Sequence, residues 1–320
     1  MMEIAELLYY LSIAFIVGVN SVAVGIGEGI ANGAAIDAIN RQPKAKSEIM
    51  NASILGMALI ETAAIIALTI SVIVLLGAVN IEKTIYFGIA QVGIAFAICF
   101  AGFAVGLSSA LPTRKAYMAI ARQPFASKKI IQFMLITQSI IQTPIIFGLV
   151  VAIFINSQAA STTTITDSLR LLASGLAIGI GSIGPVIGLG QFGAAACEGL
   201  GINKKNNNQI LSFTFVSEAI IETPVIFALI ISIVLLFLVP AGGSTIQGVA
   251  YLASALCIGL GTIGPGISSG RTASIACKQI ALYPEQYSLI SRTSMFAQGL
   301  IDTSAIYALV VAFALVMLPR

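Results

Sequence analysis

Charged residues are scarce in this sequence: Asp, Glu, Lys and Arg make up only 9% of its 320 residues, against about 25% in soluble globular proteins. Histidine and tryptophan are absent, and 58% of the residues are hydrophobic. This composition argues against a soluble globular fold and predicts a membrane protein. The net charge of +3 is small and the basic residues are dispersed, so a nucleic-acid partner is not expected.

Three further absences narrow the function. The phosphate-binding sequence Gly-x-x-x-x-Gly-Lys-Ser/Thr is missing, so we expect no ATP-hydrolysing site on this chain. No basic region precedes the first apolar run, so we expect that run to be a permanent membrane span rather than a cleaved signal. The four cysteines fall in apolar runs without a metal-like spacing, which predicts packing residues rather than disulfides or metal ligands; they are Cys99, Cys197, Cys257 and Cys277.

What the sequence has instead is eight apolar segments near or above the roughly 20 residues that cross a bilayer. They fall at about residues 7–36, 48–78, 84–111, 128–155, 168–198, 208–238, 247–276 and 287–317. Turn-rich stretches separate successive pairs, at 77–80, 157–166 and 240–244. The segments therefore predict an all-α membrane protein of eight transmembrane helices, paired into four hairpins.

One short motif recurs at a fixed period in the second segment of each pair. Its central residue is Glu61, Gln142, Glu222 or Asp302, each followed by threonine, and the steps between them are 81, 80 and 80 residues. This period indicates a fourfold internal duplication of parallel units, which we place at 1–80, 81–160, 161–240 and 241–320. A contact that repeats by rotation between such units can close into a ring.

The recurring acid carries the functional prediction. An ionised carboxylate in hydrocarbon costs roughly 2.5 to 3.5 kcal/mol, so it is usually neutralised, paired or bound to a cation. We therefore predict that Glu61, Glu222 and Asp302 carry an ion. Gln142 cannot ionise, and we interpret it, with Thr143 and Ser109, as a degenerate ion site.

Glu28 is predicted to join the first site. It and Glu61 are equidistant from the loop between their helices, each about 16 residues away, so they lie level at roughly 25 Å from the turn. The first helix of each pair is also rich in small residues, which lets helices approach closely and favours an inner ring of first helices. These residues are Gly25, Gly27, Gly29, Gly33, Gly102, Gly106, Ala110, Gly184, Gly188, Gly190, Gly264, Gly266 and Gly270.

Basic residues predict the orientation. Thirteen of the sixteen lie in the connections within hairpins: Arg41, Lys44, Lys46, Arg114, Lys115, Arg122, Lys128, Lys129, Lys204, Lys205, Arg271, Lys278 and Arg292. Only Lys83, Arg170 and Arg320 remain for the other side. The positive-inside rule then places the four hairpin loops in the cytoplasm and both termini outside.

A glycine-rich helix, an Arg-Gln-Pro loop and a second helix with a central Glu-Thr together resemble the proteolipid, or c-type rotor protein, of F-type rotary ATP synthases. The resemblance covers essentially the whole chain as four fused hairpins, and residues 302–311 are especially similar. The fusion of several hairpins, one of which lacks the acid, also resembles the proteolipids of the V-type family. The proteolipid of a V-type, ATP-driven ion pump is therefore an alternative. A secondary cation transporter and a purely structural oligomer are more distant alternatives. The parallel repeats and the lack of predicted breaks in the helices around the acid argue against a transporter.

The resemblance implies a rotor ring of copies of this chain among the lipids of a bacterial plasma membrane, with no cofactor beyond the transported ion. The ring would turn past the a subunit of a stator, which bears an essential arginine. Its loops would grip the central stalk and, through it, the ATPase head. By resemblance, the stalk contacts are Arg41, Gln42, Pro43, Arg122, Gln123 and Pro124. The third loop, at 201–204, and the fourth, at 281–284, depart from this motif.

The ion is Na⁺ or H⁺. Sodium-type rotor proteolipids resemble this chain in having Ser or Thr directly after the acid, as Thr62, Thr223 and Thr303 are here. Their helix-one glutamine is replaced by Glu28, Leu189 and Ser269 in hairpins 1, 3 and 4. In hairpin 3, Gln191 and Glu218 are candidate substitutes, and Tyr307, which braces the acid in such proteins, occurs only in hairpin 4. These features slightly favour Na⁺ at Glu61, Glu222 and Asp302.

Overall fold

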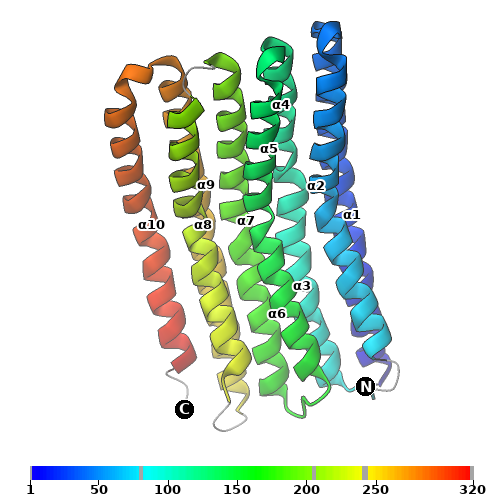
Figure 1. Ribbon diagram of the computed structural model, residues 1–320. Coiled ribbons are helices and arrows are strands. Elements are labelled where there is room, and N and C mark those ends of the chain that lie inside the picture. Colours follow the sequence, from blue (N-terminus) through cyan, green and yellow to red (C-terminus); the bar gives the residue numbers. More distant parts are fainter. Residues whose placement is uncertain (1, 79–81, 204–206, 240–243, 318–320) are drawn as a thin grey trace.

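The computed structural model describes residues 2–78, 82–203, 207–239 and 244–317. Within these ranges all regular secondary structure is helical, and eight segments are long and apolar enough to cross a membrane. The predicted all-α fold of four tandem hairpins is confirmed (Figure 1). The loops inside the hairpins lie at one end of the molecule, and the two chain termini lie at the other.

The first helices of the hairpins extend further towards the hairpin loops than the apolar segments alone predict, whereas the second helices of hairpins 3 and 4 match their predicted lengths. The first helices of the hairpins are α1 (Met2–Arg41), α3 (Ile85–Ser108) continued by α4 (Ala110–Arg122), α7 (Ile165–Ile202) and α9 (Thr245–Leu282). The second helices are α2 (Lys46–Gly77), α5 (Ser127–Ile141) continued by α6 (Thr143–Ala159), α8 (Asn207–Phe237) and α10 (Tyr287–Met317). The short 3₁₀ turns η1 (Pro43–Ala45), η2 (Pro124–Ala126) and η4 (Pro284–Gln286) link the two sets.

Proline fixes the geometry of three of the hairpin loops. The residue before each proline has nearly the same extended backbone: φ and ψ are −138° and 79° at Gln42, −136° and 74° at Gln123, and −128° and 73° at Tyr283. A residue before proline is pushed out of the helical region, so the first helix ends there. The fourth loop therefore keeps the same turn although its sequence lacks Arg-Gln. Lys204, in the third loop, lies outside the described residues.

The hairpins pack side by side as two layers. The first helices contact one another in the order α1, α3, α7, α9 and form the first-helix layer. The second helices lie over the grooves of that layer: α2 contacts α1 and α3, α6 contacts α3 and α7, and α8 contacts α7 and α9. Buried apolar side chains form two clusters, one towards the hairpin loops and one towards the termini, and the acid positions lie near their boundary.

Glycine permits the close approach of the first helices. A Cβ atom on Gly93 of α3 would lie 2.8 Å from the carbonyl oxygen of Leu171 in α7, and one on Gly190 of α7 would lie 2.8 Å from that of Ser108 in α3. Neither distance is compatible with a side chain, so alanine at either position would push the helices apart. The first-helix layer is therefore packed through its backbones, as its small residues predicted.

The outer edge of α1 carries glycines that touch nothing. Gly25, Gly29 and Gly33 follow one another at four-residue spacing, and an added Cβ on any of them would have no neighbour within 4 Å. Residues at this spacing share one face of a helix. This face of α1 is therefore shaped for a close neighbour that the single chain does not itself supply.

Hairpin 2 is locally irregular around the acid position. Its first helix has a turn at Ser109, between α3 and α4, and its second at Gln142, between α5 and α6, whereas α1, α2, α7, α8, α9 and α10 run without interruption. Both residues keep helical backbone angles, φ −62° and ψ −24° at Ser109 and φ −77° and ψ −19° at Gln142, and their N–H groups still bond the carbonyls four residues back. Pro144 follows the second turn, but Pro224 stands at the same place in α8, which continues through it. The irregularities are therefore not unwound segments, and the described residues show no discontinuous helix around the acid positions.

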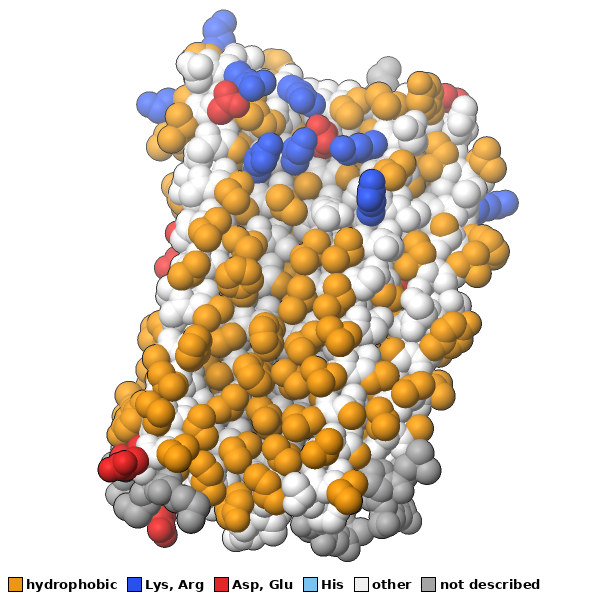
Figure 2. Space-filling model, turned by 180° about the vertical axis from the view of Figure 1, so that it is seen from behind, with side chains coloured by type: hydrophobic (Ala, Val, Ile, Leu, Met, Phe, Trp, Pro, Cys, Tyr) orange, Lys and Arg blue, Asp and Glu red, His pale blue; other side chains and the backbone are white. Residues whose placement is uncertain are grey.

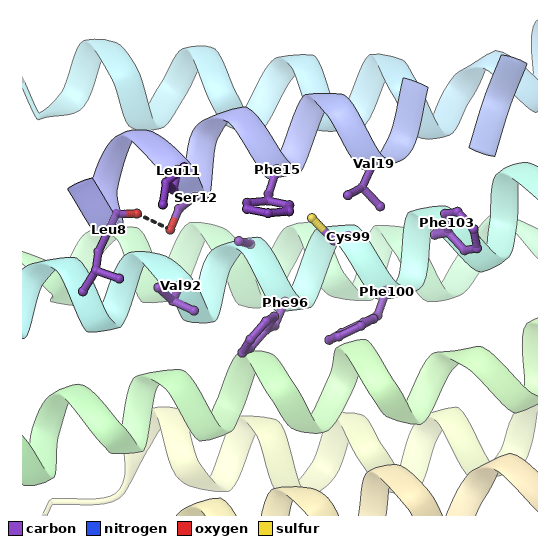
Figure 3. Close-up of a pocket in the computed structure, with 11 residues that line it drawn as sticks. Leu8, Leu11, Ser12, Phe15, Val19, Val92, Phe96, Cys99, Phe100 and Phe103 are labelled. Atoms are coloured by element: carbon purple, nitrogen blue, oxygen red, sulfur yellow. Dashed lines mark hydrogen bonds between the residues drawn. The ribbon is translucent and has the colours of Figure 1, made fainter. Parts of the chain in front are cut away.

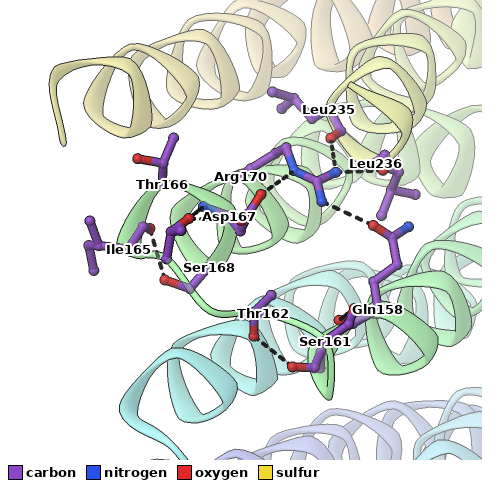
Figure 4. Close-up of polar contacts among 12 residues, drawn as sticks. Gln158, Ser161, Thr162, Ile165, Thr166, Asp167, Ser168, Arg170, Leu235 and Leu236 are labelled. Atoms are coloured by element: carbon purple, nitrogen blue, oxygen red, sulfur yellow. Dashed lines mark hydrogen bonds and ion pairs between the residues drawn. The ribbon is translucent and has the colours of Figure 1, made fainter. Parts of the chain in front are cut away.

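A buried arginine ties hairpins 2 and 3 together near the end that holds the termini (Figure 4). Arg170, in α7, is only 7% exposed. Its guanidinium donates to the carbonyl oxygens of Leu235 at 2.8 Å and Leu236 at 2.5 Å, and to Oε1 of Gln158 at 3.1 Å. Its Nε lies 3.8 Å from a carboxylate oxygen of Asp167. Arg170 thus satisfies carbonyls in the last turn of α8, which lack partners within the helix.

Tyr9 performs the same task in hairpin 1. It occupies the position two repeats before Arg170, and its hydroxyl donates to the carbonyl oxygen of Val74 at 3.2 Å, two repeats before Leu235. The two hairpins therefore close their terminal ends at the same place with different donors.

Candidate ion-binding sites

The four motif positions lie on the second helices and differ in exposure. Glu61 on α2 is exposed, Glu222 on α8 is half-buried, and Asp302 on α10 and Gln142 are buried, at 7% and 4% exposure. The ion pairs formed among the described residues use other acids, and none involves Glu61, Glu222 or Asp302. Three carboxyl groups therefore lie in membrane-spanning helices without a basic partner in the described part of the chain.

Gln142 joins two hairpins through its amide. Its Nε2 donates to the carbonyl oxygen of Leu59 in hairpin 1 at 2.8 Å and to the Ser109 hydroxyl of its own hairpin at 3.2 Å. Its Oε1 is buried and has no hydrogen-bond partner among the described residues. The structure thus brings Gln142 and Ser109 together, and adds a backbone carbonyl that the sequence did not indicate.

Glu222 reaches across the next boundary in the same way. Its carboxyl lies close to the side chain of Thr143 in hairpin 2. Thr143 directly follows Gln142, and Leu59 lies two residues before Glu61, so both contacts are made to the motif region of the preceding hairpin. At these two positions, the site therefore contains the motif residue of one hairpin and atoms from the second helix of the hairpin before it.

The helix-one position is occupied differently in each hairpin. Glu28 is half-buried and lies close enough to Glu61 for their charges to repel, so the structure brings the predicted pair together. Ser109 and Ser269 offer hydroxyls at the equivalent places, whereas Leu189 offers no polar atom. Gln191, the other residue considered for hairpin 3, is half-buried on α7.

The threonines that follow the three acids donate to their own helices. Thr62, Thr223 and Thr303 bond the carbonyls of Ala58 at 3.3 Å, Ala219 at 3.0 Å and Leu300 at 2.7 Å. Since the hydroxyl proton is used there, the oxygen lone pairs remain able to accept a hydrogen bond or bind a cation. Tyr307 is 69% exposed, and no hydrogen bond joins it to Asp302 among the described residues.

A second polar layer lies one helical turn before the acids, and the sequence interpretation found only one member of it. Gln138 donates to the Thr113 hydroxyl at 2.6 Å and to the Gly56 carbonyl of hairpin 1 at 3.3 Å. Gln298 donates to the hydroxyls of Ser294 at 3.1 Å and, in hairpin 3, Ser217 at 3.4 Å. The 80-residue spacing of these glutamines from residue 218 was the signal that could have revealed the layer.

Glu218 is the member of this layer in hairpin 3. It is fully buried, and neither of its carboxyl oxygens has a hydrogen-bond partner among the described residues. It lies one turn before Glu222, close enough for electrostatic repulsion between the two carboxyls. Hairpin 3 therefore contains a second carboxyl group in place of the amide that hairpins 2 and 4 use.

Two of the loop residues expected to contact a stalk, Arg41 and Gln123, have side-chain partners within the chain. Arg41 forms an exposed ion pair with Asp37 at 3.0 Å. The side chain of Gln123 donates to the Gly201 carbonyl at 3.0 Å and so links hairpin 2 to hairpin 3. Arg122 is exposed, and Gln42 is half-buried. Pro43 and Pro124 begin the 3₁₀ turns.

Four tandem helical hairpins, each with a membrane-embedded motif position in its second helix, define a rotor proteolipid. The family model for the ATP synthase C subunit matches the chain four times, at residues 11–74, 92–155, 172–235 and 252–315. The chain belongs to the ATP synthase C-subunit family, and it is an integral membrane protein with four such hairpins fused in tandem.

Single-hairpin relatives support the same assignment. The ATP synthase c subunit of Dehalococcoides mccartyi is 45% identical over 71 residues, which span 22% of this chain and 93% of that protein. The ATP synthase c subunit of Thermotoga maritima is 35% identical over 79 residues, which span 23% of this chain and 93% of that protein. The ATP synthase subunit c 2 of Cereibacter sphaeroides is 38% identical over 71 residues, which span 22% of this chain and 86% of that protein. Each relative therefore corresponds to about one hairpin, and membership of the family implies a ring of such hairpins within an ATP synthase.

Proposed function

We propose that this rotor protein carries one ion on each of Glu61, Glu222 and Asp302, and none on hairpin 2. The observation that carries the proposal is the set of three carboxyls without basic partners among the described residues at equivalent places, with the uncharged Gln142 at the fourth. Facing lipid, each carboxyl must be neutral, either protonated or bound to a cation. Facing an aqueous path in the a subunit of the stator, it can ionise and pair with an arginine of that protein.

The units of this rotor are the four hairpins, with boundaries near residues 80, 160 and 240. Alternation of each carboxyl between lipid and the stator path couples ion flow to rotation. The cytoplasmic loops transmit that rotation through the proteins of the central stalk to the ATPase head, and both termini face outwards. This orientation is supported by the concentration of basic residues at the loops.

The sites are proposed to lie between hairpins, and the first of them between two chains. The contacts from Gln142 to Leu59 and from Glu222 to Thr143 support this arrangement. One repeat later, the equivalent partners of Asp302 are the Ile220 carbonyl and Thr223 in hairpin 3. Among the described residues, no hairpin precedes the one that holds Glu61. Its partners would be Leu300 and Thr303 of a second copy.

Two features at the edge of the chain support this composite first site. Glu61 is exposed although its equivalents are partly or fully buried. The unoccupied glycine face of α1 lies on the first helix of the same hairpin. A second copy whose α9 packs against that glycine face would bring α10 towards Glu61, as α7 and α8 are placed relative to hairpin 4.

Na⁺ is the proposed ion because oxygen ligands converge at these places. The amide nitrogen of Gln142 donates to a backbone carbonyl and to a hydroxyl oxygen. A Na⁺ ion bound to a carboxylate at the equivalent place would need oxygen ligands of the same kind. By equivalence of position in the repeat, the oxygens for Asp302 would come from Ile220, Ser269 and Thr223. Glu28 and Glu218 supply an extra carboxyl in hairpins 1 and 3. H⁺ is the alternative, since it requires only one acceptor.

Two experiments test these proposals. Copurification of the assembled ring with a soluble ATPase head separates a rotor, of the F type or the V type, from a secondary transporter. Carbodiimide labelling of the carboxyls at fixed pH tests the ion. Slower labelling on addition of Na⁺ supports Na⁺ binding, whereas labelling that responds to pH alone rejects Na⁺ in favour of H⁺.

A further inference from the structure

A basic cavity opens on the first-helix layer near the hairpin loops. Its volume is about 240 Å³, and it is lined by Arg41 of α1, by Arg114, Lys115 and Arg122 of α4, and by Glu198 of α7. All three of these helices belong to the first-helix layer. The cavity therefore lies on the side of the molecule opposite the second helices that carry the acids.

The charges around this cavity do not cancel. Glu198 pairs with Lys115 at 2.9 Å and also with Lys278 of hairpin 4, at 3.4 Å. Arg41 pairs with Asp37. Arg114 and Arg122 form no ion pair with the described residues, so two guanidinium groups stand uncompensated at the opening. A planar guanidinium binds phosphate through two parallel hydrogen bonds.

Apolar surface lies next to these charges. In Figure 2, which views the molecule from the side of the first helices, Lys and Arg side chains gather towards the loop end, and hydrophobic side chains cover most of the surface beyond them. A second cavity, of about 460 Å³, lies between α1 and α3 in the half nearer the termini (Figure 3). It is lined almost entirely by apolar side chains, among them Phe15, Phe96, Phe100 and Phe103.

The spacing of the two features matches one lipid leaflet. Phe103 and Arg114 are 11 residues apart on the first helix of hairpin 2, or roughly 16 Å along its axis. Half of the hydrocarbon thickness of a bilayer is about 15 Å. A phospholipid with its phosphate at the arginines can therefore extend its acyl chains over the apolar face as far as the aromatic cavity.

We propose that the basic cavity binds the phosphate headgroup of an anionic phospholipid, held by Arg114 and Arg122 on the first-helix side of the layer. Basic pockets between transmembrane helices on the cytoplasmic side favour such headgroups. A protein segment would match the cations but would leave the membrane-embedded apolar face uncovered, whereas a lipid covers both. The inference depends on the membrane location of the chain and is independent of the ion carried by the acids.

The test uses assembled rings in nanodiscs of phosphatidylglycerol and phosphatidylcholine. After mild detergent extraction, the retained lipids are quantified by mass spectrometry. We expect phosphatidylglycerol to be enriched over the bulk ratio with the native chain. In the double variant Arg114→Gln/Arg122→Gln, the enrichment should fall by about tenfold, because two charged contacts are lost. The matched control Lys44→Gln/Lys46→Gln removes the same charge from the loop of hairpin 1, outside the cavity, and should retain the enrichment.

Three results would overturn the inference. The first is that phosphatidylglycerol is not enriched in the native ring. The second is that the control variant loses as much enrichment as the double arginine variant. The third is that the double arginine variant retains phosphatidylglycerol as the native ring does but no longer binds the soluble head. The last result would assign the arginines to the stalk. If the double glutamine variant does not assemble, Arg114→Lys/Arg122→Lys keeps the charge but loses the two-pronged geometry. It should then retain less phosphatidylglycerol than the native ring, and native retention in this variant would also reject the site.

Discussion

The amide nitrogen of Gln142 lies 2.8 Å from the carbonyl oxygen of Leu59, across the boundary between hairpins 1 and 2. In the other hairpins an acid occupies the equivalent place. In hairpin 2, the amide group of Gln142 therefore occupies the place where we propose that the carboxyl groups of the other hairpins bind an ion. The contact between hairpins 1 and 2 at this place does not depend on the binding or release of an ion.

Replacing Gln142 with Glu tests whether hairpin 2 can still work as a carrier. We expect the number of ions moved per ATP to rise towards about four-thirds of the starting ratio, because four carboxyls then replace three. Simultaneous measurement of ion uptake and ATP hydrolysis in vesicles gives this ratio. An unchanged ratio in a fully assembled, active variant would show that hairpin 2 has become structural in more than the side chain at position 142.

The missing carboxyl also sets the energy of one turn. Each monovalent ion that crosses 100 mV releases about 2.3 kcal/mol, so fewer ions per turn provide less energy for synthesis. When ATP hydrolysis drives the same ring, a steeper gradient is attainable. We therefore expect a machine that favours ion pumping relative to a ring of equal size with an acid in every hairpin. The steady-state gradient supported by native and Gln142→Glu rings in vesicles measures this difference, and the variant should reach the lower value.

Thr143 and Thr303 distinguish sites within a chain from the site between chains. With Thr143→Ala, we expect Na⁺ to protect Glu222 from carbodiimide less well, with little change at Asp302, because Glu222 is the acid that contacts Thr143. With Thr303→Ala, protection should weaken at Glu61, which we place beside this residue of a second copy. Mass spectrometry of labelled peptides reports each carboxyl separately. Loss of protection at Asp302 instead would show that the threonine serves the acid of its own hairpin.

The open face of α1 predicts a selective defect in assembly. Gly29→Leu adds a side chain where the single chain leaves space, so the four hairpins should still fold. We expect the ring to fail, because the neighbouring copy could no longer approach closely. Gly93→Leu is the contrasting variant: it would meet the backbone of α7 and should disrupt the chain itself. Native gel electrophoresis and helical content by circular dichroism separate the two defects, and intact rings of Gly29→Leu would contradict the proposed interface.

The orientation follows from the distribution of basic residues and is checked with thiols. A cysteine at position 205 should react with a membrane-impermeant reagent only from the cytoplasmic side, and one at Ser161 only from outside. Lys205 lies outside the described residues, but its loop joins α7 to α8. Of the native cysteines, Cys99, Cys197 and Cys277 are buried and Cys257 is half-buried, so the background should be low. Reversed labelling would place the loops outside.

Long-range repetition made the fold predictable. The period that relates Glu61 to Asp302 indicated the four hairpins, and the small residues of the first helices indicated the closely packed layer. The helix ends were harder, because hydropathy reports the part of a helix that is apolar rather than its whole length. Thus α1 continues past residue 36 to Arg41, through the charged Asp37, and α7 continues past residue 198 to Ile202, through Gly199 and Gly201.

The details of the sites depended on neighbours that a sequence does not place. Pro144 and Pro224 stand in the same local sequence, yet only the helix of hairpin 2 becomes irregular beside its proline. The carbonyl of Leu59 carries no side-chain signature, so its contact with Gln142 was invisible before the hairpins were packed. Gln138 and Gln298 could have been found from their spacing. Their bonds to other hairpins could not.

The exposed Glu61 and the unoccupied glycine face of α1 lie at one edge of the row of hairpins, where we propose that a second copy packs. In a ring built only from copies of these four hairpins, hairpins are added four at a time and the proposed ion carriers three at a time. The number of ions moved per revolution would then be a multiple of three. Such a ring could not change its ratio of ions to ATP one ion at a time unless the hairpins themselves gained or lost a carboxyl group.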